Sequence, residues 1–301
     1  MQQEIQIIPS HNIDALQWDS CITASNNSLI YATTSYLNHM AINWSGIVLN
    51  NYDAVMPIPW RKKLGITYCY DVPFMQQLGV FTKPGFNALN LQEELFKFCK
   101  YGHYNFNYAS LFKKDQCTQQ TNFIINLAQG FSSIKQRYNK DLLSNLKRAE
   151  NFSLSYKTAN LADAITAFKS LYANRFTHMR DQDYENFSRL CKQLQSQQQA
   201  FVRQVQSTSG EMLSVALFLK DHRRIYNIMN ATTPNGKNFE ANPFLLNKVL
   251  EEFSGTNFIF DFEGSDVPGI KHFYQKFGAT DQPYYRLHFN HLPAPIKWLK
   301  R

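Results

Sequence analysis

The chain has 301 residues, of which 44% are hydrophobic and 18% charged, so it can bury a core of one large domain or two domains. The start, Met1-Gln-Gln-Glu, lacks the basic and apolar regions of a secretory signal, and no apolar run approaches the ~18 residues of a membrane span. The five cysteines are scattered and show no Cys-x-x-Cys spacing, which argues against a disulfide framework and a zinc site. We therefore expect a soluble, cytoplasmic protein with no metal.

Charge divides the chain into two unequal parts. Residues 1–130 contain 8 Lys/Arg and 8 Asp/Glu, whereas residues 131–301 contain 23 and 15 and so carry the whole net charge of +8. A local positive field favours an anionic ligand such as a nucleotide, coenzyme A or RNA, although a solvated basic face explains it equally well. Composition also changes near Gln129-Gly130, which predicts an N-terminal domain at 1–130 and a C-terminal domain at 131–301.

The first part combines short helices with strand pairs. Residues 12–24 are predicted to form a helix with Leu16 and Trp18 directed inward. Two apolar runs around the Asn50-Asn51 turn are typical of a β-hairpin. The helices of this part are expected at residues 12–24, 28–40 and 89–100, and the strands at residues 43–49, 54–59, 66–70, 104–108 and 121–126.

The second part begins with helices and continues as an antiparallel meander. Residues 162–176 carry apolar positions at the i, i+3, i+4, i+7 spacing of an amphipathic helix. Three apolar runs separated by short polar turns follow and predict three consecutive strands. The helices are expected at residues 141–151, 162–176, 184–198 and 244–253, and the strands at residues 153–157, 201–206, 212–219, 224–231 and 284–290.

The stretch 257–279 is the most informative part of the sequence. An aromatic run at residues 258–262 predicts a buried strand, and the polar residues 263–266 predict a loop. Pro268 suits the first turn of a helix, and Gly278 suits the position just beyond its end. A loop held between a rigid strand and a helix is a common place for functional side chains.

Within this stretch, Phe273-Tyr274-Gln275-Lys276-Phe277-Gly278-Ala279 resembles the late helix segment of the GNAT acyltransferases. Together with Phe260-Asp261-Phe262-Glu263-Gly264-Ser265 and Pro268-Gly269, it is similar to the FemAB-like branch, whose members carry two GNAT-type domains. Asn145-Leu146-Lys147-Arg148-Ala149-Glu150 loosely matches an upstream helix of that branch. The resemblance implies an α/β (α+β) fold of two GNAT-like domains, each a mixed, mainly antiparallel sheet flanked by helices.

The resemblance also suggests roles for residues of this stretch. Tyr274 matches the tyrosine that often protonates the departing thiolate in the GNAT family, although it can equally be a packing residue. Asp261 and Glu263 alternate on the expected strand and would share one face. A carboxylate there can accept the amine proton if burial raises its pKa; otherwise it pairs with a basic residue. His222, His272 and His288 are further possible bases outside any recognisable constellation.

The expected ligand sites lie elsewhere in the chain. Acetyl-CoA-dependent relatives hold the pyrophosphate with a glycine-rich helix start, whereas residues 233–243 contain one glycine, Gly236, beside Lys237 and Asn242. We expect these three to bind the co-substrate, acetyl-CoA or another acyl-CoA. The candidate substrate-binding residues are Gln76 and Gln77, whose segment resembles a central strand of FemAB-like N-terminal domains, and Asn227, Asn230 and Arg148.

Three functions therefore remain open. The first is an N-acyltransferase that moves an acyl group from a CoA thioester to an amine acceptor bound between the two domains. The second is a FemAB-type transferase that uses aminoacyl-tRNA and acts on a cell-envelope precursor. Against it, the lysine that follows the phenylalanine in such enzymes is absent from Phe273-Tyr274-Gln275. The third is a non-catalytic GNAT-like binding protein, which the missing glycine-rich loop favours.

Overall fold

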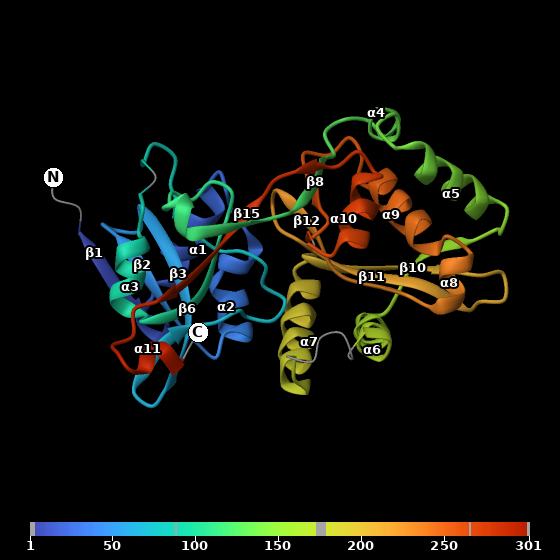
Figure 1. Ribbon diagram of the computed structural model, residues 1–301. Helices are drawn as coiled ribbons and strands as arrows, with labels where there is room; N and C mark the ends of the chain where they lie inside the picture. Colours follow the sequence, from blue (N-terminus) through green and yellow to red (C-terminus); the bar gives the residue numbers. More distant parts are fainter. Residues whose placement is uncertain (1–3, 88, 173–178, 265, 300–301) are drawn as a thin grey trace. The chain divides into compact units, whose positions relative to one another are not determined.

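The computed structural model describes residues 4–87, 89–172, 179–264 and 266–299. The chain forms two compact units, unit 1 with Met1–Gln120 and Pro283–Arg301, and unit 2 with Thr121–Gln282. Each unit has one mainly antiparallel sheet accompanied by helices, so the predicted α/β fold class with two such sheets is confirmed (Figure 1).

Unit 1 contains an eight-stranded sheet. Its strands are β1 Ile5–Pro9, β2 Asn43–Leu49, β3 Ala54–Lys63, β4 Ile66–Cys69, β5 Phe81–Thr82, β6 Tyr101–Phe106, β7 Cys117–Gln120 and β15 Tyr284–Asn290. They are ordered β1-β2-β3-β4-β6-β15-β7, with β5 beside β3. The α-helices are α1 Ala15–Ala24, α2 Thr34–Met40, α3 Gln92–Phe98 and α11 Ile296–Leu299.

Several predictions for unit 1 are confirmed, and others are wrong. The hairpin around Asn50-Asn51 is present as β2 and β3. Trp18 is fully buried on α1, but Leu16 is 86% exposed, because Trp18, Cys21 and Ile22 at i, i+3, i+4 spacing form the inward face. The single helix expected at residues 28–40 is a 3-10 turn, Ile30–Ala32, followed by α2.

The division between the units differs from the predicted boundary at residue 130. Strand β15, near the C-terminus, pairs antiparallel with β6 and with β7 and so belongs to the sheet of unit 1 (Figure 1). Charge and composition cannot reveal this, because strand pairing between distant segments leaves no local signal. Residues 283–301 are therefore part of unit 1 rather than of a domain at 131–301.

Unit 2 contains a seven-stranded sheet. Its strands are β8 Phe123–Asn126, β9 Ser155–Thr158, β10 Ala200–Gln206, β11 Met212–Lys220, β12 Arg224–Thr232, β13 Ile259–Asp261 and β14 Thr280–Asp281. They are ordered β14-β8-β13-β12-β11-β10-β9. The helices are α4 Phe131–Lys135, α5 Lys140–Glu150, α6 Leu161–Tyr172, α7 Asp181–Ser196, α8 Pro234–Asn238, α9 Ala241–Glu252 and α10 Pro268–Gln275.

The layers of unit 2 follow from its apolar patterning. Helices α9 and α10 lie on one side of the sheet and α6 and α7 on the other (Figure 1). Leu246 and Val249 of α9 pack with Phe218 and Phe260 of the sheet in one buried cluster. The predicted meander is confirmed as β10-β11-β12. The helix predicted at residues 162–176 is present as α6 up to Tyr172, and residues 173–176 lie outside the described part.

Helix α10 begins and ends as its sequence predicts. Pro268 occupies its first turn, where the missing N–H costs no hydrogen bond. Gly278, just beyond its end, has a φ of +65°, which favours glycine. Among the described residues, no helix combines the length and apolar character needed to cross a bilayer.

Candidate functional site

The candidate site of unit 2 lies where the pairing of two neighbouring strands ends. Strands β12 and β13 are parallel and pair only from Arg224 opposite Ile259 to Tyr226 opposite Asp261. Strand β13 ends there, whereas β12 continues to Thr232. The β13 side of residues 227–232 therefore has no strand partner in the described residues.

A bulge in β12 gathers polar side chains beside this edge. Phe218 of β11 lies opposite Asn227, but the preceding Leu217 lies opposite Met229, so Ile228 is an extra residue. Because of this bulge, Asn227 and Asn230 lie on the same face of the sheet although they are three positions apart. Asn227 is only 4% exposed, and neither polar atom of its side chain has a hydrogen-bond partner in the described residues.

A cavity of about 260 Å³ lies beyond the end of β12. The predicted ligand residues Lys237 and Asn242 line it, and the Oδ1 atom of Asn242 is buried without a hydrogen-bond partner in the described part of the chain. Asn242 lies in the first turn of α9, where N–H groups and the helix dipole favour an anion. The remaining lining residues are Asn145, Tyr172, Thr232, Glu240, Ala241, Pro243 and Phe273.

Gly236 lies close to this cavity but has a packing role. Its N–H donates to the Thr233 hydroxyl at 2.9 Å and so caps the short helix α8. A Cβ on Gly236 would lie 2.1 Å from the backbone oxygen of Leu213, which leaves no room for a side chain. The glycine permits close approach of α8 to β11, and its N–H is already engaged.

Tyr274 lies on α10 among aromatic side chains. Its ring centroid is 4.7 Å from that of Phe262 and 5.7 Å from that of Phe273. Burial raises the pKa of the Tyr274 hydroxyl far above its ordinary value, and the nearby carboxylates of Glu263 and Asp261 raise it further. The hydroxyl is therefore protonated at neutral pH, and the raised pKa makes it a weaker acid than an ordinary tyrosine.

Asp261 is the most deeply buried of the predicted site residues. It is 0% exposed and forms an ion pair with Arg224, which is 3% exposed. Asn122 also donates to its carboxylate at 3.2 Å, and the Glu263 N–H donates to it at 2.9 Å. The second possibility raised by the sequence, pairing with a basic residue, is what the structure shows.

The strand expected at residues 258–262 ends at Asp261, so the prediction that Asp261 and Glu263 share a strand face is wrong. Glu263 has a φ of +58° and belongs to the loop that follows. The next residue must be glycine, because a Cβ on Gly264 would lie 2.1 Å from the Thr121 backbone oxygen. Glu263 is half-buried, whereas Asp261 is enclosed. Ser265 lies outside the described residues.

Arg148 lies at the surface of unit 2, next to residues of the cavity. Its guanidinium forms an ion pair with Glu240 and donates to Asn145 at 2.9 Å. Both partners line the cavity at the start of α9. Arg148 is thus linked to the cavity rim through its partners.

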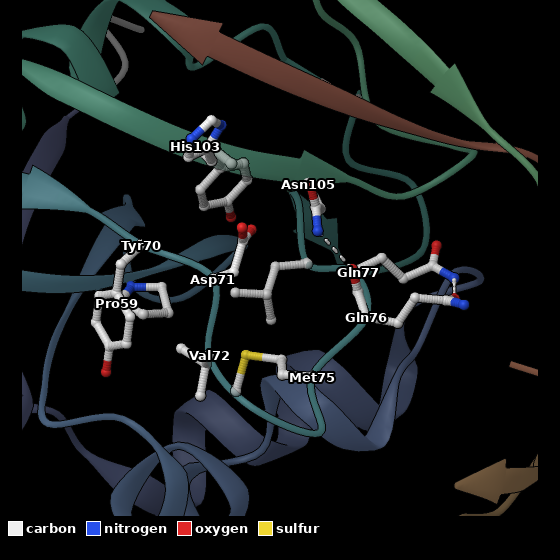
Figure 2. Close-up of a pocket in the computed structure, with 11 residues that line it drawn as sticks. Pro59, Tyr70, Asp71, Val72, Met75, Gln76, Gln77, His103 and Asn105 are labelled. Atoms are coloured by element: carbon white, nitrogen blue, oxygen red, sulfur yellow. Dashed lines mark hydrogen bonds between the residues drawn. The ribbon is translucent and has the colours of Figure 1, made fainter. Parts of the chain in front are cut away.

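Gln76 and Gln77 belong to unit 1, whereas the other predicted site residues belong to unit 2. They lie in an irregular segment that contains one isolated bridge, Leu78 with Phe106, so the expected central strand is absent there. Both line a small pocket, in which the Gln77 amide donates to the Gln76 side chain at 2.7 Å (Figure 2).

Sequence reasoning missed two aromatic members of the cavity. Tyr172 and Phe273 fit apolar helical patterns, which give no sign that they line a cavity. The Tyr172 hydroxyl accepts the N–H of Thr232 at 3.3 Å, on the last residue of β12.

Comparisons with known proteins place this geometry among known folds. No protein-family model and no curated protein sequence matches the chain. Among solved structures, FemX matches over 100% of both chains with a TM-score of 0.67 and 12% identity. L-PGS from Bacillus licheniformis matches over 95% of both chains, with a TM-score of 0.55 and 11% identity. Saccharomyces cerevisiae N-myristoyltransferase with bound myristoyl-CoA matches over 97% of this chain and 84% of its own, with a TM-score of 0.50 and 12% identity.

At such low identities these similarities show the fold. The resemblance read from residues 260–279 is confirmed at this level, since FemX matches along the whole length of the chain. The chain shares the fold of FemX along its whole length, with two mainly antiparallel α/β units in one polypeptide.

Proposed function

We propose that this protein is an N-acyltransferase that transfers an acyl group from a CoA thioester to an amine. The observation that carries the proposal is the row of polar side chains on one face of β12. Asn227, Asn230 and Thr232 lie on this face, and Thr232 also lines the cavity at the start of α9. A thioester with a long polar arm and a phosphate end fits a row of this kind.

The anionic end of the donor is assigned to the cavity. Lys237 supplies a positive charge, and the first turn of α9 supplies N–H groups and the positive end of the helix dipole. The Oδ1 of Asn242 has no partner within the described residues and would accept from an N–H or O–H of the donor rather than contact its phosphates. The engaged N–H of Gly236 is not part of this anion site.

The chemical step is assigned to the end of β13 and to α10. The attacking amine loses a proton, and we assign its acceptance to Glu263, which is half-buried, rather than to Asp261, which is held by Arg224. The departing thiolate gains a proton, and the protonated hydroxyl of Tyr274 is its proposed donor. Asn227 and Asn230 would orient the reacting groups beside the free edge of β12.

Calorimetric titration with CoA and acetyl-CoA tests the proposal. We expect binding that weakens as salt is raised, because the contacts to phosphate are electrostatic. Lys237→Ala should weaken binding about tenfold, or ~1.4 kcal/mol. Lys248→Ala is the matched control, because Lys248 lies on α9 but pairs with Glu251 at 2.8 Å and does not line the cavity. Equal affinity of all three proteins, or no binding, contradicts the proposal.

A second candidate is a transferase that uses aminoacyl-tRNA. The charge of residues 131–301, with 23 Lys/Arg against 15 Asp/Glu, favours a large polyanionic donor. Binding of tRNA without binding of CoA would support this function. If neither donor binds, a non-catalytic role becomes the better explanation, in agreement with the single, structurally engaged glycine of residues 233–243.

A further inference from the structure

Unit 1 contains a small pocket lined by polar and apolar residues, whereas the proposed acyl-donor site belongs to unit 2. The pocket is lined by side chains from β6 and from the segment 70–78, including Asp71, Gln77, His103 and Asn105 (Figure 2). His103 and Asn105 are two positions apart on β6 and therefore lie on the same face of the sheet. Its volume of about 20 Å³ leaves room for about one water-sized group.

The pocket has an excess of hydrogen-bond acceptors. The Nδ1 atom of His103, the Oδ1 atom of Asn105 and the Oε1 atom of Gln77 are all buried without a partner in the described residues. One N–H of each neighbouring amide is engaged, since Asn105 donates to the Gln76 backbone oxygen at 2.8 Å and Gln77 to the Gln76 side chain. A group that brings N–H or O–H donors into the pocket would satisfy the three unpaired acceptors.

The charges around the pocket disfavour a cation. Arg286, on the neighbouring strand β15, pairs with Asp71 and neutralises the carboxylate of the pocket. Burial and the nearby Arg286 lower the pKa of His103, Asp71 raises it and His288 lowers it, and the net shift is downward, so a positive charge on the imidazole is unfavourable. The imidazole is neutral at neutral pH and keeps one acceptor nitrogen.

We propose that this pocket binds the NH2 group of a carboxamide, with His103 Nδ1 and Asn105 Oδ1 accepting its two N–H bonds. A primary amide nitrogen is about the size of the pocket. Its two N–H groups can satisfy two of the unpaired acceptors, and it carries no charge. Gln77, which is 2% exposed, provides a third acceptor for another donor of the same molecule.

The inference goes beyond the proposed function, because the pocket belongs to unit 1 and the proposed acyl-donor site belongs to unit 2. Binding of a carboxamide is measured without an acyl donor. A failure of this inference is therefore distinguishable from a failure to bind CoA.

The test is an NMR titration of the full-length protein labelled with 15N at histidine and asparagine, with acetamide as the probe. We expect acetamide to shift the His103 imidazole and the Asn105 side-chain resonances saturably, whereas acetate and methylammonium leave them unchanged. The absence of a saturable shift overturns the proposal, because the acceptors are then satisfied by a trapped water. Equal shifts with methylammonium overturn it as well.

A pair of variants checks the location. His103→Phe retains a ring but removes the acceptor nitrogen, and the Asn105 shift caused by acetamide should be lost. His288→Phe is the matched control, since the His288 ring lies 4.7 Å from that of His103 but does not line the pocket. The His288 variant should respond like the natural protein. A response retained in a folded His103→Phe protein contradicts the proposal, and the titration of the natural protein decides the matter if this variant does not fold.

Discussion

Replacing Asp261 by asparagine should destabilise unit 2 rather than only abolish a catalytic step. Asp261 is 0% exposed and Arg224 is 3% exposed, so the substitution leaves a buried guanidinium without its counter-charge. Loss of one partner of a buried ion pair costs ~3–5 kcal/mol. Arg224 keeps its hydrogen bond to Gln282 at 2.9 Å, which does not compensate for the charge.

Thermal unfolding followed by circular dichroism measures this cost. For a unit of this size we expect the Tm to fall on the order of 10 °C. Arg224→Met combined with Asp261→Leu should recover much of the loss, because apolar replacement of both partners is often tolerated. Glu263→Gln is the control and should change the Tm little. An Asp261→Asn protein with an unchanged Tm but no turnover would refute the structural role and return Asp261 to the role of proton acceptor.

The other expectations concern single positions. Tyr274→Phe should lower kcat with little change in Tm, and unchanged turnover in an active protein would remove Tyr274 as the general acid. Gly264→Val should cost at least ~1–3 kcal/mol in urea unfolding, because its Cβ meets a backbone oxygen at 2.1 Å. Burial raises the pKa of Glu252, but hydrogen bonds from Arg203 and Tyr156 outweigh this and lower it below 4.5. The resulting stability is present above pH 4.5 and lost as the pH falls through the lowered pKa. Glu252→Gln should flatten this acid dependence, and an identical pH profile of Tm would contradict it.

Much of the fold could be predicted because local signals agreed with it. The apolar runs and turns of residues 200–232 predicted the meander, and Pro268 and Gly278 predicted the ends of α10. Strand β15 could be predicted as a strand but not placed in unit 1, because its partners β6 and β7 are distant in the sequence. The short strands β5 and β14, with two residues each, carry no periodicity to detect.

The candidate site could be predicted in part. Lys237 and Asn242 line one cavity, as expected from residues that flank a helix start. The buried environment of Asp261 could not be predicted, because its partner Arg224 lies 37 positions earlier on a neighbouring strand. Residue spacing alone also places Asn227 and Asn230 on opposite faces of a strand, and only the bulge at Ile228 brings them to one face.

Hydrogen exchange with and without acetyl-CoA tests the central claim most directly. The account predicts that acetyl-CoA slows amide exchange along residues 227–232 of β12 and in residues 237–244 around the start of α9. Exchange in β9 and β10, which form one edge of the sheet of unit 2, should not change. Protection confined to other parts of the chain, or no protection at a saturating concentration, would contradict the assignment of an acyl-CoA site to this edge.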